Sequence, residues 1–129
     1  MAGELILVVE DDPKSRKLVH DVLEYEGYRV AEATAGDEGV RLAKALAPAL
    51  ILMDLELPRL DGIAAFALLR DDPATRDIPV VAVTASAMAH DRPKVRDAGF
   101  DGHQCKPLNL QEFVGLVHRI VASRRGGDA

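Results

Sequence analysis

The chain has 129 residues, nearly half of them hydrophobic, and a formal net charge of −5. This length predicts one domain with a mainly aliphatic core, and the acidic balance argues against broad electrostatic binding to nucleic acid or anionic membranes. The single cysteine, Cys105, excludes an intramolecular disulfide and fits a reducing compartment. No signal-peptide pattern is present and no apolar run approaches the roughly 18 residues of a membrane span, so we expect a cytoplasmic protein without membrane insertion.

Short aliphatic runs alternate with helical patterns along the whole chain. In chain order we expect strand 5–9, helix 13–26, strand 28–33, helix 36–47, strand 49–53, helix 63–70, strand 78–83, helix 91–99, strand 102–105 and helix 110–121, with a frayed tail over 122–129. Asp12 and Asn109 are good N-cap residues, and Pro13 suits the first helical position. The continuous apolar run 49–53 is typical of a strand buried on both faces. Five strand–helix units predict a single α/β domain, a doubly wound five-stranded parallel sheet with helices on both faces.

Polar residues follow four of these strands. They are Glu10-Asp11-Asp12, Asp54, Thr84-Ala85 and Lys106-Pro107. Parallel strands bring their carboxyl ends to one edge of the sheet, which is where open α/β sheets bind ligands. Unpaired buried carboxylates are costly, so acids placed there predict chemistry with a metal and a phosphate.

Each candidate has a functional and an ordinary interpretation. Asp54 could cap a turn, or it could accept a phosphoryl group as an aspartyl-phosphate. Glu10 and Asp11 beside it would suit Mg²⁺, which prefers carboxylates, water and phosphate oxygens. Lys106 is either a surface lysine or a cation paired with Asp54 and then with its phosphate. Thr84 could bond to backbone or donate to a phosphoryl oxygen.

Other polar residues carry less information. Asp12 is interpreted as a cap and not as a metal ligand. The four histidines, His20, His90, His103 and His118, lack metal-ligand spacing. Cys105 follows apolar positions without an adjacent histidine to activate it, so we expect it in the core.

Five motifs together resemble one family. They are Glu10-Asp11, Asp54 within Leu-Met-Asp-Leu-Glu-Leu-Pro, Asp61-Gly62, Thr84-Ala85 and Lys106-Pro107. The combination resembles the response-regulator receiver domain of two-component signalling, over about residues 5–121. In segments 9–11, 17–21, 50–54 and 78–85 the chain is also similar to the single-domain receivers that control cell division and polarity in alphaproteobacteria.

The resemblance implies a flavodoxin-like (βα)5 fold and a phosphorelay function. Asp54 would take a phosphoryl group from a histidine kinase or a histidine phosphotransfer protein. Mg²⁺ would be bound by Asp11, Asp54 and the backbone carbonyl of Glu56, with Glu10 acting through water. Thr84 and Lys106 would contact the phosphoryl group, and Thr84 would move toward it as the switch.

The chain departs from the family pattern in three places. Glu10 replaces the more familiar Asp of the acid pair and is one methylene longer. His103 stands where the family usually has a Tyr or Phe that rotates inward with Thr84, so the usual aromatic switch is in question; histidine is polar and can titrate. Glu56 adds an acid beside the site, where it could affect phosphoryl lifetime.

Protein partners are the expected targets. A transcription factor would need a helix-turn-helix after residue 121, so we expect a stand-alone regulator, a monomer or weak dimer, that signals through a downstream protein. By resemblance, Ser15, Leu18, Val22 and Pro107 would contact the phosphodonor, and the fourth helix, fifth strand and fifth helix would form the output face. Three alternatives remain open: a phosphorylation-independent interaction module, a phosphatase that uses Asp54 as nucleophile, and the receiver of a hybrid kinase.

Overall fold

The computed structural model describes residues 3–84, 99–105 and 109–128. In it, five parallel strands form one sheet in the order β2-β1-β3-β4-β5. The strands are β1 (Leu5–Val9), β2 (Arg29–Ala33), β3 (Leu50–Asp54), β4 (Val80–Thr84) and β5 (Gly102–Cys105), and the helices are α1 (Pro13–Tyr25), α2 (Gly36–Leu46), α3 (Gly62–Asp71) and α5 (Leu110–Asp128). This strand order is that of the flavodoxin-like doubly wound fold, so the predicted fold class is confirmed.

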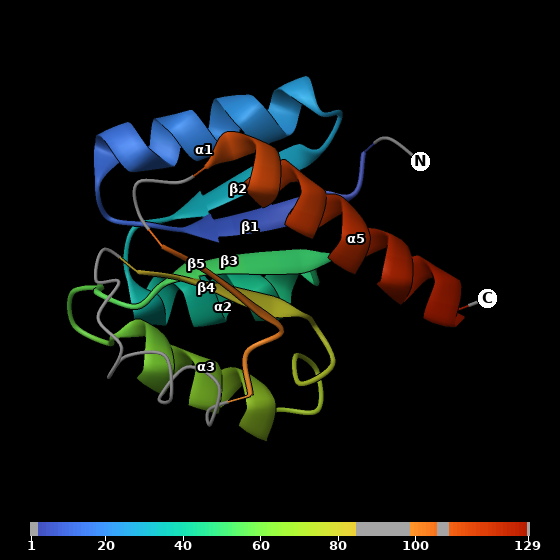
Figure 1. The fold of residues 1–129 in the computed structure, drawn as a ribbon. Helices are drawn as coiled ribbons and strands as arrows, with labels where there is room; N and C mark the ends of the chain where they lie inside the picture. The colour runs from blue at the N-terminus through green and yellow to red at the C-terminus, as the bar shows by residue number, and fades with distance from the viewer. Residues whose placement is uncertain (1–2, 85–98, 106–108, 129) are drawn as a thin grey trace.

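The sheet lies between two layers of helices. Helices α1 and α5 cover one face, and α2 and α3 cover the other (Figure 1). Successive side chains of β1 point to opposite faces of the sheet, as in any β-strand. Ile6 and Val8 belong to the core under α1 and α5, whereas Leu7 and Val9 belong to the core under α2 and α3. A strand buried on both faces has no polar position, which explains the uninterrupted aliphatic sequence of β1.

Side-chain caps fix the starts of three helices. Asp12 accepts a hydrogen bond from the Ser15 backbone N–H at 2.9 Å, and Asn109 accepts from Glu112 N–H at 3.1 Å. Asp61 caps α3 in the same way, accepting from the Ala64 N–H at 2.8 Å. The caps at Asp12 and Asp61 fix the ends of the β1–α1 and β3–α3 connections, which both lie at the carboxyl edge of the sheet.

The C-terminal helix is longer than the sequence suggested. We expected a frayed tail over 122–129, and in the structure α5 continues to Asp128. The segment contains no proline to stop the helix at residue 122, although Gly126 and Gly127 are poor helix formers. The helix expected over 91–99 falls almost entirely outside the described residues. Within the described part of the chain, no helix is long and apolar enough to cross a membrane.

Candidate functional site

Three carboxylates converge at the carboxyl edge of the central strands. Val9 of β1 is paired with Met53 of β3, so the next residues, Glu10 and Asp54, follow neighbouring positions in the sheet. One ligand oxygen from each of Glu10, Asp11 and Asp54 lies within 4.8 Å of the other two. The structure thus brings together the acids that the sequence singled out after two separate strands.

This cluster has the chemistry of a divalent-cation site. Glu10 is 5 % exposed and Asp54 is 3 % exposed, while Asp11 reaches the surface. The backbone N–H of Asp12 donates to Glu10 Oε2 at 3.1 Å, and the N–H of Glu56 donates to Asp54 Oδ1 at 2.9 Å. These donors offset only part of the repulsion among three acidic groups, two of which are buried away from water. A small cation bound by oxygen ligands would neutralise the rest, so the residues fit Mg²⁺.

Thr84 and Glu56 complete the edge beside Asp54. Thr84 ends β4 with 2 % of its surface exposed, and its hydroxyl donates to Glu56 Oε1 at 3.4 Å. Sequence reasoning noticed Glu56 as an extra acid but missed this contact, which joins residues 28 apart in the chain. The hydroxyl proposed to bind a phosphoryl oxygen is therefore directed to a carboxylate in this structure.

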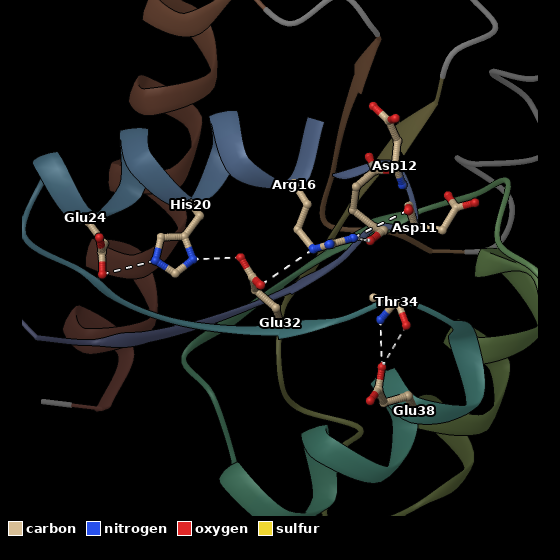
Figure 2. A network of polar contacts seen from close by, with 9 residues as sticks. Asp11, Asp12, Arg16, His20, Glu24, Glu32, Thr34 and Glu38 are labelled. Atoms are coloured by element: carbon tan, nitrogen blue, oxygen red, sulfur yellow. Dashed lines mark hydrogen bonds and ion pairs between the residues drawn. The ribbon is translucent and has the colours of Figure 1, made fainter. Parts of the chain in front are cut away.

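A chain of ion pairs leads from helix α1 to the turn that carries the acids (Figure 2). His20 contacts Glu24 at 3.1 Å through Nε2 and Glu32 at 2.8 Å through Nδ1. Glu32 also pairs with Arg16, with 3.5 Å between Oε1 and Nε. Arg16 in turn donates through Nη1 to the Glu10 carbonyl at 3.0 Å and the Asp11 carbonyl at 3.4 Å. No pattern in the sequence indicates a role for Arg16 or Glu32.

The protonation of His20 makes this chain of contacts depend on pH. Burial lowers the pKa of His20, but its hydrogen bonds to Glu32 and Glu24 more than compensate, and the pKa lies above its ordinary value. A raised folded-state pKa stabilises the fold below the unfolded pKa of about 6.5, and this contribution is lost as pH rises through the folded value. We expect His20→Gln to lower the free energy of unfolding by about 0.5 kcal/mol near pH 5.5, since the pair is partly solvated, and by less near pH 8.5. Urea unfolding at the two pH values measures this, and an equal loss at both would contradict it.

The structure describes some of the remaining predicted residues and leaves others out. Ser15 donates its hydroxyl to Asp12 Oδ2 at 2.7 Å, so Asp12 acts as the expected cap. Leu18 is 46 % exposed on α1, whereas Val22 packs partly buried against the core. His103 is half-buried in β5, paired with Ala82 of β4. Ala85, Lys106 and Pro107 lie outside the described residues.

Comparisons with known proteins agree with this site. Residues 6–118 match the family described as "Response regulator receiver domain". The chain is 38 % identical over 124 residues to the polar-differentiation response regulator DivK of Brucella ovis, covering 96 % of this chain and 97 % of that protein. Among solved structures it is similar to the receiver domain of a Pseudomonas aeruginosa sensor histidine kinase, PA1611, with magnesium in the active-site cleft (TM-score 0.87, 35 % identity, 94 % of this chain and 99 % of that one). A putative response regulator from Chloroflexus aurantiacus superposes with a TM-score of 0.88 at 28 % identity, covering 93 % and 98 % of the two chains.

Proposed function

The chain belongs to the response regulator receiver domain family, and from that premise we propose that it accepts a phosphoryl group on Asp54 and signals by protein–protein interaction. The convergence of Glu10, Asp11 and Asp54 carries this proposal. The similarity to DivK over nearly the full length of both chains supports a stand-alone regulator that acts in cell polarity or division.

We assign the phosphoryl transfer to Asp54. A carboxylate oxygen of Asp54 attacks the phosphorus of a partner's phosphohistidine, an O–P bond forms, and the P–N bond breaks with its electron pair going to the histidine nitrogen. Mg²⁺, when bound, would neutralise the charge that gathers on the phosphoryl oxygens. Asp11, Asp54 and the Glu56 carbonyl would hold the ion, with Glu10 acting through water. The partly buried hydrogen bond from the Glu56 N–H would orient the Asp54 carboxylate.

Phosphorylation would be read out by Thr84. Its hydroxyl must leave Glu56 in order to donate to a phosphoryl oxygen, so the contact at 3.4 Å supports an arrangement that belongs to the unphosphorylated protein. Lys106 would pair with the phosphoryl group, and His103 on β5 would take the place of the family's aromatic switch residue. The new charge of about −1.5 to −2 supplies the driving force for this rearrangement.

Partner surfaces follow from the same proposal. A histidine kinase or phosphotransfer protein would dock over α1, where Leu18 is exposed. By the family resemblance it would also contact Ser15, Val22 and Pro107. A downstream protein would bind the face that includes β5 and α5. We propose no catalytic turnover beyond self-catalysed phosphoryl transfer and hydrolysis. A phosphorylation-independent interaction module is the second candidate, favoured by the polar His103 at the switch position.

The deciding experiment is the intact mass of the protein after incubation with Mg²⁺ and acetyl phosphate. We expect one phosphoryl adduct on the wild type and none on Asp54→Asn, which keeps the side-chain shape but lacks the nucleophilic carboxylate. The same pair of proteins is then tested with a phosphorylated histidine phosphotransfer domain. An adduct that persists in Asp54→Asn would place the acceptor elsewhere, and no adduct from either donor would favour the interaction module.

A further inference from the structure

The turn between β1 and α1 has to hold two acids in place over a short distance. Only Glu10, Asp11 and Asp12 separate the end of the strand from the first residue of the helix. The Glu10 N–H is fixed by the Ala33 carbonyl at 2.9 Å, which ties the start of the turn to β2. The orientation of the Glu10 and Asp11 peptide groups then decides where the two carboxylates point.

Arg16 contacts this turn from the first helical turn of α1. Its Nη1 donates to the carbonyl oxygens of both Glu10 and Asp11, at 3.0 and 3.4 Å. The guanidinium is a rigid planar fork, so contacts made by one nitrogen restrain the position of the others. One end of the fork thus holds the two peptide groups that flank Asp11.

The other end of the fork is fixed by Glu32 of β2. Glu32 pairs with Arg16 Nε at 3.5 Å and with His20 Nδ1 at 2.8 Å, and His20 is held by Glu24 at 3.1 Å. The Arg16 side chain is only 21 % exposed, so the contact is partly shielded from water. Figure 2 shows these side chains in one row from the far end of α1 to the acidic turn.

We propose that Arg16 is a positioning residue for the metal-binding acid pair, braced by Glu32. Its carbonyl contacts pre-orient the turn so that Glu10 and Asp11 meet Asp54 in the geometry that a divalent ion requires. The proposal rests on the proposed function, because it concerns the Mg²⁺ site assigned there. Residues that orient metal ligands typically change affinity by about 10- to 100-fold when removed.

The charge of Arg16 allows this role to be separated from simple electrostatics. A cation close to the site repels Mg²⁺, so an Arg16 that acted only through its charge would weaken binding, and Arg16→Met would tighten it. A positioning role predicts the opposite change. Arg16→Lys keeps the charge but lacks the fork, so it should resemble wild type if only charge matters and Arg16→Met if position matters.

The experiment is an NMR titration of the full chain with Mg²⁺ alone, following backbone amide shifts, for wild type, Arg16→Met, Arg16→Lys and Glu32→Gln. Lys17→Met is the matched control, because it removes one charge from the adjacent residue, which pairs with Asp21 at 3.0 Å. We expect the Kd for Mg²⁺ to rise about tenfold in both Arg16 variants, less in Glu32→Gln, and not at all in Lys17→Met.

Each outcome bears on the proposal. Wild-type affinity in Arg16→Met, or tighter binding, would overturn it. A loss shared by Lys17→Met would show that the effect is not specific to the contacts of Arg16 and would also overturn it. Glu32→Gln retains Arg16 and keeps the test valid if Arg16→Met fails to fold. If the wild type binds no Mg²⁺, both the proposed metal site and the role of Arg16 are wrong. If the wild type binds Mg²⁺ and the Arg16 variants bind it with the same Kd, only the role of Arg16 is wrong.

Discussion

Replacing Gly62 with alanine is expected to lower the free energy of unfolding by about 3 kcal/mol, at the upper end of overpacking penalties. A Cβ at residue 62 would lie 2.4 Å from the carbonyl oxygen of Asp54 and 2.7 Å from Cα of Leu55. Both are backbone atoms, so neither can rotate away as a side chain would. The start of α3 and the residue proposed to accept the phosphoryl group would have to move apart.

The same substitution should slow phosphoryl acceptance, because the atom it displaces belongs to Asp54. Chemical unfolding measures the first effect, and the rate of adduct formation with acetyl phosphate at saturating Mg²⁺ measures the second. Gly115→Ala is the control, since a Cβ there meets nothing within 4 Å in the middle of α5. It should raise the free energy of unfolding by about 0.5 to 1 kcal/mol, as alanine does in place of glycine in a helix. Equal stability of Gly62→Ala and wild type would show that the turn after β3 yields easily.

The sequence predicted the sheet well because each strand end is marked by a change of residue type. The run 49–53 of aliphatic residues stops at Asp54, and β3 covers Leu50–Asp54, one residue later at each end than expected. The helix after residue 121 has no clear sequence signal, because Ala, Ser and Arg do not stop a helix while Gly126 and Gly127 disfavour one. Gly62 was noticed as part of a turn motif, but the close approach to Asp54 depends on how α3 packs.

Some residues of the candidate site could likewise be predicted from the sequence, and others could not. Glu10, Asp11 and Asp54 could be predicted because each directly follows a strand or ends one, and parallel strands end at one edge. The contacts of Thr84 with Glu56 and of Arg16 with Glu32 could not, since they join separate elements and depend on side-chain directions. An arginine five residues after an acid carries no local signal, because its partners are backbone carbonyls.

Asp11→Asn is expected to be more stable than wild type without Mg²⁺ and less stable than wild type when Mg²⁺ is added. Without Mg²⁺ the variant should be more stable by about 1 kcal/mol, because it removes one of three negative charges whose ligand oxygens lie within 4.8 Å. The backbone N–H groups of Asp12 and Glu56 already offset part of the repulsion, which limits the gain. With Mg²⁺ at about 100 times its Kd, the wild type should gain about 2.7 kcal/mol, while the variant gains little.

Thermal unfolding of both proteins across a Mg²⁺ series measures this reversal as two curves that cross. Asp12→Asn is the matched control, because it removes a charge from the adjacent residue while asparagine keeps the cap that Asp12 forms with the Ser15 N–H. It should retain the full Mg²⁺ response if Asp12 is a cap and no ligand. A stabilised Asp11→Asn that still responds to Mg²⁺ would mean that Glu10 and Asp54 suffice to bind the ion. A variant less stable than wild type even without Mg²⁺ would mean that the contacts of Asp11 stabilise the fold by more than its repulsion from Glu10 and Asp54 destabilises it. The fold, and not the ion, would then determine the geometry of the three acids.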